Sequence, residues 1–302
     1  MSKALRYSFV LAGAYLFCTP SALAFCRTNT CDPSKGDTCT LDSAGCRTGG
    51  HDLAWVSSCV TYAVQEDGSK ANQVSASVFE NILADAFATW KAADCGDGKH
   101  PSINVESLGL VSCNKPEYNS DQGNANVFMF DDEDWMTTGS GDALGLTTVW
   151  FDRKTGQIYD ADVEVNGTGR LTHGSPQDGA DLQSIVTHEI GHFLGLDHAN
   201  TQSAVMYATY NPGRDNLRLL RDDDVKGICA IYPPSRQAAS SECEPRHGFA
   251  STCAVPKEDE GCSFSVPRKS SNTPLSRGAF PVLFALAGLV GWARGRRRRV
   301  TR

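Results

Sequence analysis

The sequence predicts a single α+β domain that spans about residues 55–235. Short stretches rich in β-branched and aromatic residues predict strands, and stretches with apolar residues at helical spacing predict helices. Of the 302 residues, 40% are hydrophobic and 21% are charged, which is typical of a globular chain long enough for one sizeable domain with appendages. The order of the strand and helix candidates along the chain favours the α+β class.

The first strand and the first helix of the domain are expected over 55–64 and 74–93. The segment WVSSCVTYAV has the composition of a strand. In the helix that follows, the apolar residues recur at helical spacing, and they are Val78, Ile82, Leu83, Ala86, Phe87 and Trp90. This stripe predicts a face that packs on the core, and we find no cofactor-binding pattern in it.

Four further strands and two further helices complete the predicted domain. The strands are expected over 102–106, 126–130, 145–151 and 161–166, separated by clusters of turn residues. Asp178 or Asp181 is expected to cap a second helix that runs to about Leu194, and a third helix follows Asp222. Beyond these elements the composition turns to Ser, Glu, Pro and Cys, so residues 236–278 are expected to form a stalk.

The twelve cysteines indicate an exported protein. They do not follow the paired CxxC spacing of a zinc ribbon, so we expect disulfides. Removal of Cys18 with an N-terminal signal peptide would leave eleven cysteines, an odd number, and the sequence does not give their pairing. Residues 25–54 are rich in Cys, Gly and Thr with little periodicity, so they are expected to form a disulfide-tied N-terminal segment.

Residues 1–24 have the features of a secretory signal peptide. A positively charged start precedes an apolar stretch and the small residues of Ala-Leu-Ala at 22–24. The mature chain is therefore expected to begin near Phe25. A lipoprotein signal ending before Cys26 is the alternative, although Phe25 is bulkier than the small residue expected before a lipidated cysteine.

The C-terminal residues 279–302 combine an apolar run with an arginine cluster. The run is about 15 residues long, slightly short of the roughly 20 that span a bilayer, and the arginines would hold their end in the cytoplasm. A buried core helix is the alternative, but a core helix has no use for four consecutive arginines. We therefore expect a transmembrane or membrane-contacting segment here.

This tail resembles the MYXO-CTERM sorting signals of myxobacteria and their relatives. The features in common are Gly261-Cys262, a polar spacer, a short apolar run and a terminal arginine cluster. The resemblance implies recognition by a sorting machinery, location at the cell surface (the outer envelope) or outside the cell, and Cys262 as the residue that is processed or attached. Setting Cys262 aside then leaves ten cysteines, enough for five disulfides. The net charge of −7, with its one dense basic run in this tail, gives no reason to expect a nucleic-acid partner.

The eleven residues HEIGHFLGLDH, which begin at His188, form a metal-binding motif. His188 and His192 are four residues apart, so they lie on one face of a helix and can bind one zinc ion. Gly195 can end that helix, which lets the chain turn back and bring His198 in as the third ligand. Three protein ligands leave a fourth position for water, and Glu189 is placed to take a proton from that water.

The motif resembles the HExxHxxGxxH signature of metzincin metallopeptidases at every fixed position. In that family a Met-turn lies beneath the metal, and Met206 follows the motif at a suitable distance. Within the metzincins the chain is most similar to matrixins. MYATY matches their Met-x-x-x-Tyr segment, and Tyr210 then falls where the family lines its specificity pocket, although Ala208 replaces the usual proline. DDDVKGICAIYP at 222–233 and AFATW at 86–90 resemble further matrixin elements.

The resemblance covers about residues 55–235 and implies a fold and an activity. The implied fold is a twisted mixed sheet of about five strands with three main helices. The implied protein is a zinc endopeptidase, which we expect to be monomeric, acting on extracellular proteins or peptides. In the family the substrate lies extended along an edge strand, and Leu144, Gly145 and Leu146 are the best candidates for that edge.

The chain also departs from the matrixin pattern. There is no PRCGxPD cysteine switch, and threonines at 147–148 and Tyr159 stand where vertebrate matrixins bind a second zinc, so we predict one zinc ion.

Calcium is a further candidate ligand, although acidic residues near a turn are more often merely solvated. The residues that would bind it are Asp160, Asp162 and Glu164.

Two classes of function remain open from the sequence. The first is an active endopeptidase, which the presence of Glu189 favours. The second is a catalytically silent surface binding or adhesion module that keeps the zinc fold. A small-molecule hydrolase or an aminopeptidase is less favoured, because a cleft along an extended strand suits internal peptide bonds.

Overall fold

The computed structural model describes residues 25–121, 123–135, 141–174, 179–211, 213, 215–244 and 253. The expected signal peptide and the C-terminal segment 279–302 lie outside these residues, as does Cys262. Within the described ranges, no helix is both long enough and apolar enough to cross a membrane. The predictions for the two ends of the chain therefore stay predictions.

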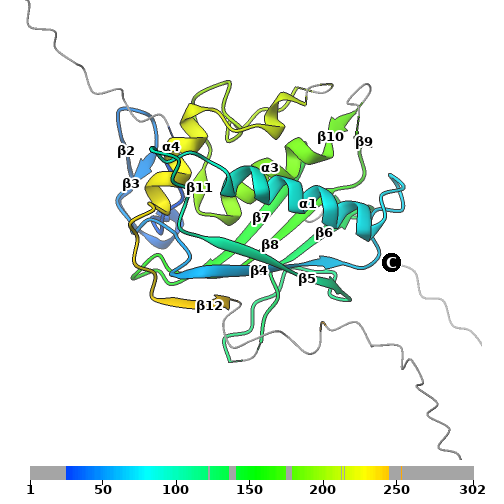
Figure 1. Ribbon diagram of the computed structural model, residues 1–302, viewed down its shortest axis with the longest axis horizontal. Coiled ribbons are helices and arrows are strands. Elements are labelled where there is room, and N and C mark those ends of the chain that lie inside the picture. Colours follow the sequence, from blue (N-terminus) through cyan, green and yellow to red (C-terminus); the bar gives the residue numbers. More distant parts are fainter. Residues whose placement is uncertain are drawn as a thin grey trace, which may run out of the picture. The chain divides into compact units, whose positions relative to one another are not determined.

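A six-stranded sheet forms the centre of the domain (Figure 1). Its strands are β4 (Ser57–Gln65), β5 (Asn104–Val111), β6 (Val127–Asp131), β7 (Gly145–Phe151), β8 (Ile158–Asn166) and β12 (Ser240–Glu244). The order is β5-β4-β6-β8-β7, and β12 pairs with the beginning of β4 on the edge of β4 that also pairs with β6. All pairs are parallel except β7 with β8, which is antiparallel. The sheet is therefore mixed, with its one antiparallel strand at an edge.

Among the described residues, three helices and several short elements complete the domain. The helices are α1 (Ala76–Lys91), α3 (Leu182–Phe193) and α4 (Asp222–Ile231). The short strands are β1 (Cys26–Arg27), β2 (Thr40–Leu41), β3 (Arg47–Thr48), β9 (Leu171–Thr172), β10 (Ala180–Asp181) and β11 (Leu196–Asp197), and the 3-10 turns are η1 (Pro33–Lys35) and η2 (Asn216–Arg218). Helices α1 and α3 lie side by side over one face of the sheet (Figure 1). The predicted α+β class, with a mixed sheet and three main helices, is confirmed.

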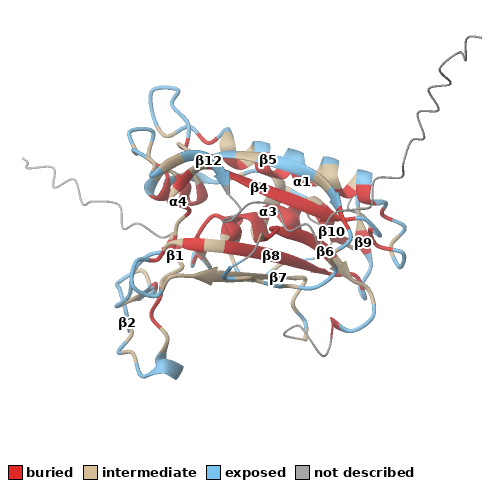
Figure 2. Cartoon of the chain, turned by 90° about the horizontal axis from the view of Figure 1, so that it is seen from below, coloured by how far each residue is buried: buried red, intermediate tan, exposed pale blue. Residues whose placement is uncertain are grey.

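The core lies between these two helices and the sheet. Strands β4 and β8 are largely buried, whereas β5 and β7 at the two edges are more exposed (Figure 2). Aromatic rings from the sheet and both helices meet there, with centroids 4.7 to 5.7 Å apart, and they are Tyr62, Phe87, Phe128 and Phe193. Burying each such ring contributes about 2 kcal/mol, so this cluster is a main reason why α3 stays fixed on the sheet.

The last turn of α3 is held by two buried aromatic donors. Trp55 Nε1 donates to the Phe193 carbonyl at 2.8 Å, and the Tyr232 hydroxyl donates to the Leu194 carbonyl at 3.0 Å. The carbonyls at the end of a helix have no partner within it, so these side chains satisfy groups that would otherwise be buried without one. The end of α3 is therefore fixed by residues far away in the sequence.

The structure differs from the sequence prediction mainly at element ends. The apolar stripe of α1 is buried at Leu83, Ala86, Phe87 and Trp90, but Val78 and Ile82 are only partly buried and Phe79 takes part instead. Strand β5 was expected over 102–106 but runs to Val111, because its pairing with β4 extends that far. Strand β7 has the predicted bounds, and Asp181 caps α3.

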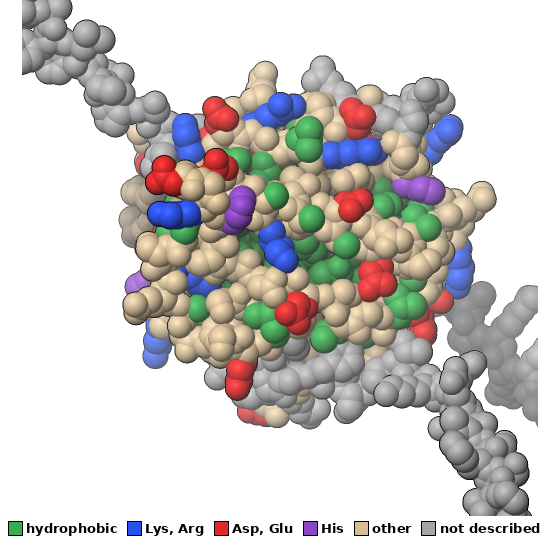
Figure 3. All heavy atoms as spheres, viewed as in Figure 1, with side chains coloured by type: hydrophobic (Ala, Val, Ile, Leu, Met, Phe, Trp, Pro, Cys, Tyr) green, Lys and Arg blue, Asp and Glu red, His purple; other side chains and the backbone are tan. Residues whose placement is uncertain are grey.

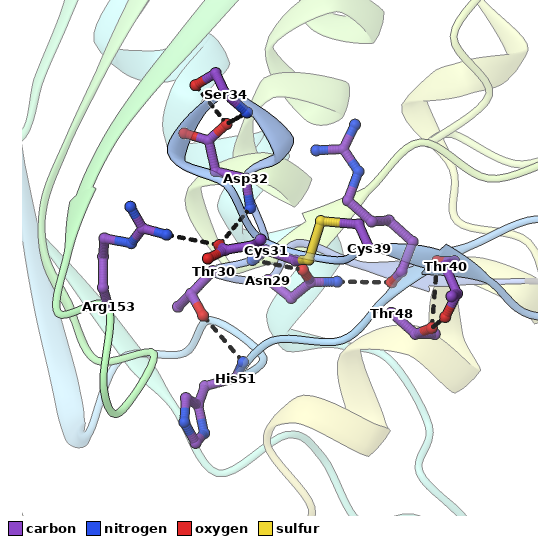
Figure 4. Close-up of a disulfide and its surroundings, with 12 residues drawn as sticks. Asn29, Thr30, Cys31, Asp32, Ser34, Cys39, Thr40, Thr48, His51 and Arg153 are labelled. Atoms are coloured by element: carbon purple, nitrogen blue, oxygen red, sulfur yellow. Dashed lines mark hydrogen bonds and ion pairs between the residues drawn. A yellow bond between two sulfur atoms is a disulfide. The ribbon is translucent and has the colours of Figure 1, made fainter.

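The ten cysteines left by the sequence argument form five disulfides among the described residues. The pairs are Cys26–Cys46, Cys31–Cys39, Cys59–Cys243, Cys95–Cys229 and Cys113–Cys253. The first two lie within the N-terminal segment, where Figure 4 shows the Cys31–Cys39 bond beside Asn29 and Thr40. The Cys59–Cys243 and Cys113–Cys253 disulfides, together with strand β12, attach the beginning of the expected stalk to the domain.

The surface carries both signs of charge. On the face shown in Figure 3, the Lys and Arg side chains and the Asp and Glu side chains are interspersed rather than gathered by sign. Some charged side chains of the described residues form ion pairs, for example Arg27 with Asp52 at 3.0 Å and Arg153 with Asp37 at 2.6 Å. Such exposed pairs contribute little to stability, about 0–1 kcal/mol each.

Candidate metal centre and active site

Helix α3 carries His188, Glu189 and His192. Its first turn is capped by Asp181, whose Oδ2 accepts a hydrogen bond from the Ser184 amide at 2.9 Å. Since residues four apart lie one turn apart on the same face, the two histidines point from α3 in one direction. The cap and the aromatic contacts at the other end together fix where that face lies.

The chain reverses directly after α3 and brings His198 back to the same place. Helix α3 ends at Phe193, and Gly195 has a φ of +97°. A Cβ at Gly195 would lie 2.6 Å from the Leu53 carbonyl oxygen, so both the backbone angle and the space require glycine. Asp197 Oδ1 then accepts the His198 amide at 2.7 Å. Asp197 therefore fixes the backbone of the predicted third ligand.

The Nε2 atoms of the three histidines converge on one point. The Nε2 atom of His192 lies 3.2 Å from that of His188 and 3.3 Å from that of His198. The three ligand atoms all lie within 4.8 Å of one another. For bonds of 2.0–2.1 Å, two ligands of a tetrahedral zinc ion are about 3.3 Å apart. The residues present therefore fit a tetrahedral zinc ion.

Two of the ring orientations are fixed by backbone carbonyls. His188 Nδ1 donates to the Val205 carbonyl at 2.7 Å, and His192 Nδ1 donates to the Leu196 carbonyl at 2.9 Å. A carbonyl only accepts, so Nδ1 carries the proton and the Nε2 lone pair faces the other rings. Burial lowers the pKa of His188, and burial with the neighbouring His198 lowers that of His192 to about 4. The rings are thus held neutral, the form that binds metal.

The carboxylate of Glu189 is packed against strand β7. It is buried, and its Oε2 accepts a hydrogen bond from the Thr147 hydroxyl at 2.6 Å. A Cβ at Gly145 would lie 2.6 Å from Oε1, so only glycine lets β7 approach this closely. Burial raises the pKa of Glu189. The sequence analysis missed the role of Thr147, although a residue two positions after Gly145 lies on the same face of the strand.

The turn that contains Met206 lies directly beneath α3. A Cβ at Gly191 would lie 2.1 Å from Met206 Sδ and 3.1 Å from Trp90. Because glycine has no side chain, the sulfur of Met206 can pack directly against the helix backbone at this position. Asp224 of α4 accepts the Val205 amide at 2.9 Å and the Met206 amide at 3.1 Å. Because the Val205 carbonyl orients His188, Asp224 supports a candidate ligand through this turn. The sequence analysis did not find Asp224.

A cleft of about 820 Å³ opens over the three histidines and Glu189. The residues predicted to bind substrate line it, namely Leu144, Gly145, Leu146 and Tyr210. The Tyr210 hydroxyl also accepts the Asp181 amide at 2.9 Å, which ties this wall to the first turn of α3. Within the described residues β7 pairs with β8 alone, so its other edge borders the cleft.

The three acidic residues of β8 lie on the face of the strand away from the aromatic core. Asp160 is fully buried, and neither of its carboxylate oxygens has a hydrogen-bond partner. Asp162 accepts the amides of Glu117 at 2.9 Å and Val127 at 2.7 Å. The oxygens of Asp160, Asp162 and Glu164 do not gather within 4.8 Å of one another, as those of the histidines do. Calcium binding here stays a prediction.

One other group of metal-ligand side chains gathers in the described part of the chain. It consists of Cys59, Glu106 and Cys243. The two sulfur atoms are bonded to each other in a disulfide, so neither is available as a thiolate ligand. The histidine cluster is therefore the arrangement that fits a metal.

The fold and the histidine cluster are those of a metallopeptidase-type domain, and sequence comparison agrees. Residues 111–233 match the model of the Matrixin family. The match covers less than half of the chain, and over these residues it agrees with the resemblance noted from the motifs.

Several metalloproteinases are similar to parts of the chain. Metalloendoproteinase 1-MMP of Arabidopsis thaliana is 45% identical over 62 residues, 20% of this chain and 17% of the relative. Metalloendoproteinase 1 of Glycine max is 27% identical over 157 residues, 51% of this chain and 45% of the relative. Macrophage metalloelastase of Oryctolagus cuniculus is 36% identical over 111 residues, 32% of this chain and 24% of the relative. The chain spans less than half the length of each of these relatives.

We predict that Gly191→Ala destabilises the protein, although alanine favours a helix by about 1 kcal/mol. The added Cβ would overlap Met206 Sδ. We expect the free energy of unfolding to fall by about 2 kcal/mol, measured by denaturant titration. Gly169→Ala is the matched control, because a Cβ there meets open space and should change stability little. An unchanged or more stable Gly191→Ala protein would show that the turn does not pack this tightly.

We predict that Thr147→Val lowers kcat/KM for peptide cleavage about tenfold, because the hydroxyl that orients Glu189 is lost. Thr147→Ser keeps the hydroxyl and should retain most of the activity. Steady-state kinetics on one quenched peptide compares the three proteins. Equal kcat/KM for the valine variant and the wild type would contradict the proposed role of this hydrogen bond.

We predict that Asp160→Asn stabilises the protein at pH 8 in EDTA by about 2 kcal/mol. Burial and then Asp162 raise the pKa of Asp160 to about 10, and burial raises that of Asp162 to about 7. The folded protein therefore keeps protons that the unfolded chain releases above about pH 4, so stability falls as the pH rises from there. The gain from Asp160→Asn should shrink toward pH 4.

The measurement is chemical unfolding between pH 4 and pH 9, with and without calcium. If calcium binds at Asp160, Asp162 and Glu164, it should stabilise the wild type and not the Asp160→Asn variant. A variant that is less stable than the wild type at pH 8 in EDTA would contradict the unpartnered state of the Asp160 carboxyl group.

Proposed function

We propose that this protein is a zinc-dependent endopeptidase that cleaves internal peptide bonds of extracellular proteins. The observation that carries the proposal is the convergence of three imidazole Nε2 atoms at tetrahedral spacing, next to the buried carboxylate of Glu189. The relatives named metalloendoproteinases and the matrixin domain support the same activity.

The residues of the cleft divide the catalytic work. His188, His192 and His198 would hold one zinc ion, which when bound acidifies water and polarises a carbonyl. Glu189 receives the proton of the attacking water on Oε1, because Oε2 is engaged by the Thr147 hydroxyl. Its raised pKa suits a group that must hold this proton and then pass it to the leaving amide nitrogen.

The free edge of β7 would position the substrate. An extended peptide can pair with this edge through main-chain hydrogen bonds, with alternate side chains directed into and away from the cleft. Leu144, Gly145 and Leu146 line the cleft on one side and Tyr210 lines it elsewhere. This arrangement presents an internal peptide bond to Glu189, which is why we favour an endopeptidase over an aminopeptidase.

A catalytically silent surface binding or adhesion module is the second candidate. It would need the metal site and the β7 edge but not an oriented carboxylate. The fit of Gly145 against Glu189 and the short hydrogen bond from Thr147 favour the enzyme, because both position the carboxylate that would accept the proton.

We further propose that the protein is exported and acts at the cell surface or outside the cell as a monomer. The five disulfides fit an oxidising compartment. The signal sequence at 1–24, the sorting segment at 279–302 and processing at Cys262 rest on the sequence alone. Its partners would be protein or peptide substrates and a sorting machinery.

We predict that the exported chain cleaves a quenched peptide library at internal bonds and that Glu189→Gln lowers the rate by at least about 100-fold. The variant removes the proton acceptor but keeps the shape of the side chain. Metal analysis should find one zinc ion per chain in both proteins. A zinc-loaded, folded wild type that cleaves no better than Glu189→Gln would support the silent module instead.

A further inference from the structure

The disulfide-tied N-terminal segment contacts the turn between the second and third candidate ligands. Strand β1 pairs antiparallel with β11, with Arg27 opposite Leu196. Thr28 continues this contact, because its amide donates to the Gly195 carbonyl at 3.0 Å. Its own carbonyl accepts the Leu53 amide at 2.8 Å, so Thr28 is held from both sides.

The hydroxyl of Thr28 reaches a carbonyl that already serves the metal site. Thr28 Oγ1 donates to the Leu196 carbonyl at 2.9 Å, and His192 Nδ1 donates to the same oxygen at 2.9 Å. A carbonyl oxygen has two lone pairs, so it accepts both bonds together. The orientation of the His192 ring thus depends on a carbonyl whose position Thr28 helps to set.

The same N-terminal segment also contacts the chain beyond His198. Asn200 Nδ2 donates to the Ala44 carbonyl, next to Gly45. The Cys26–Cys46 disulfide links this contact to strand β1. The turn that carries the third candidate ligand is therefore held by the N-terminal segment on both sides.

We propose that Thr28 is a positioning residue of the zinc site and that the N-terminal segment, residues 25–54, is an integral part of that site. This inference rests on the proposed zinc-binding function. By fixing the Leu196 carbonyl, Thr28 keeps the His192 Nε2 lone pair directed at the metal and so raises zinc affinity. Groups that orient metal ligands in this way commonly change affinity about 10- to 100-fold when they are removed.

The position of Thr28 in the cleft agrees with this role. Thr28 lines the cleft together with Asp197 and His198. Glu189 also lines the cleft, so the N-terminal segment does not cover it. The segment therefore forms part of one wall of the cleft. Its removal would take away the hydrogen bonds to Gly195 and Leu196, and we expect loss of zinc affinity rather than activation.

The test compares zinc affinity in the full exported chain for the wild type, Thr28→Val and Thr28→Ser. Competition with a fluorescent chelator gives the zinc dissociation constant, and thermal unfolding of the zinc-free proteins gives a separate measure of stability. We expect about tenfold weaker zinc binding for the valine variant and less than a twofold change for the serine variant.

Thr40→Val is the matched control. It makes the same substitution on the β2–β3 hairpin of the same segment, where the Thr40 hydroxyl contacts that of Thr48 at 2.8 Å (Figure 4). Its zinc affinity should equal that of the wild type. This control separates the position of Thr28 from any general effect of replacing threonine in the segment.

Two outcomes would overturn the inference, and they differ in what else they overturn. If Thr28→Val has a lower Tm without zinc but the zinc affinity of the wild type, Thr28 supports only the fold, and the proposed enzyme stands. If the wild type itself binds no zinc ion at His188, His192 and His198, both proposals are wrong.

Discussion

The rest of the structure depends on holding three imidazole Nε2 atoms around one point, with the lone pairs of His188 and His192 directed inward. Without a cation, the lone pairs of His188 and His192 face each other across 3.2 Å with no hydrogen between them, which is unfavourable. The protein maintains this arrangement by fixing the opposite side of two rings with backbone carbonyls, those of Val205 and Leu196. Each carbonyl belongs to a turn that is itself fixed by a distant element. The geometry of the site is thus a property of the whole domain.

Glycines at close contacts make this arrangement compact. Gly195 lets the chain reverse against Leu53, Gly191 admits the sulfur of Met206, and Gly145 admits the carboxylate of Glu189. In each case the contact partner lies where a side chain would otherwise be. The helix, the turn beneath it and the edge strand of the cleft are therefore closer together than larger residues would permit, at the place where the proposed chemistry requires close approach.

The features that could be predicted from the sequence are those that the local spacing of residues determines. The histidines, Glu189 and Gly195 follow from helical geometry and from the conformational freedom of glycine, and β7 has the predicted bounds because turn residues flank it. The metal site could be found because its ligands lie within eleven residues. The number of disulfides followed from counting, but their pairing did not.

What the sequence did not predict depends on contacts between distant segments. Thr147, Asp224 and Thr28 act on the site from β7, α4 and the N-terminal segment, and no local pattern marks them. The same is true of β12, which joins the sheet through pairing with β4 in a stretch expected to be a stalk. Such residues become visible only when the tertiary arrangement is known.

Anomalous diffraction at the zinc edge from crystals of the exported protein would test the central claim most directly. The account predicts one strong peak in the domain, about 2.0–2.1 Å from the Nε2 atoms of His188, His192 and His198. A zinc-loaded protein whose peak lies elsewhere, or whose three rings have turned away from one another, would contradict it.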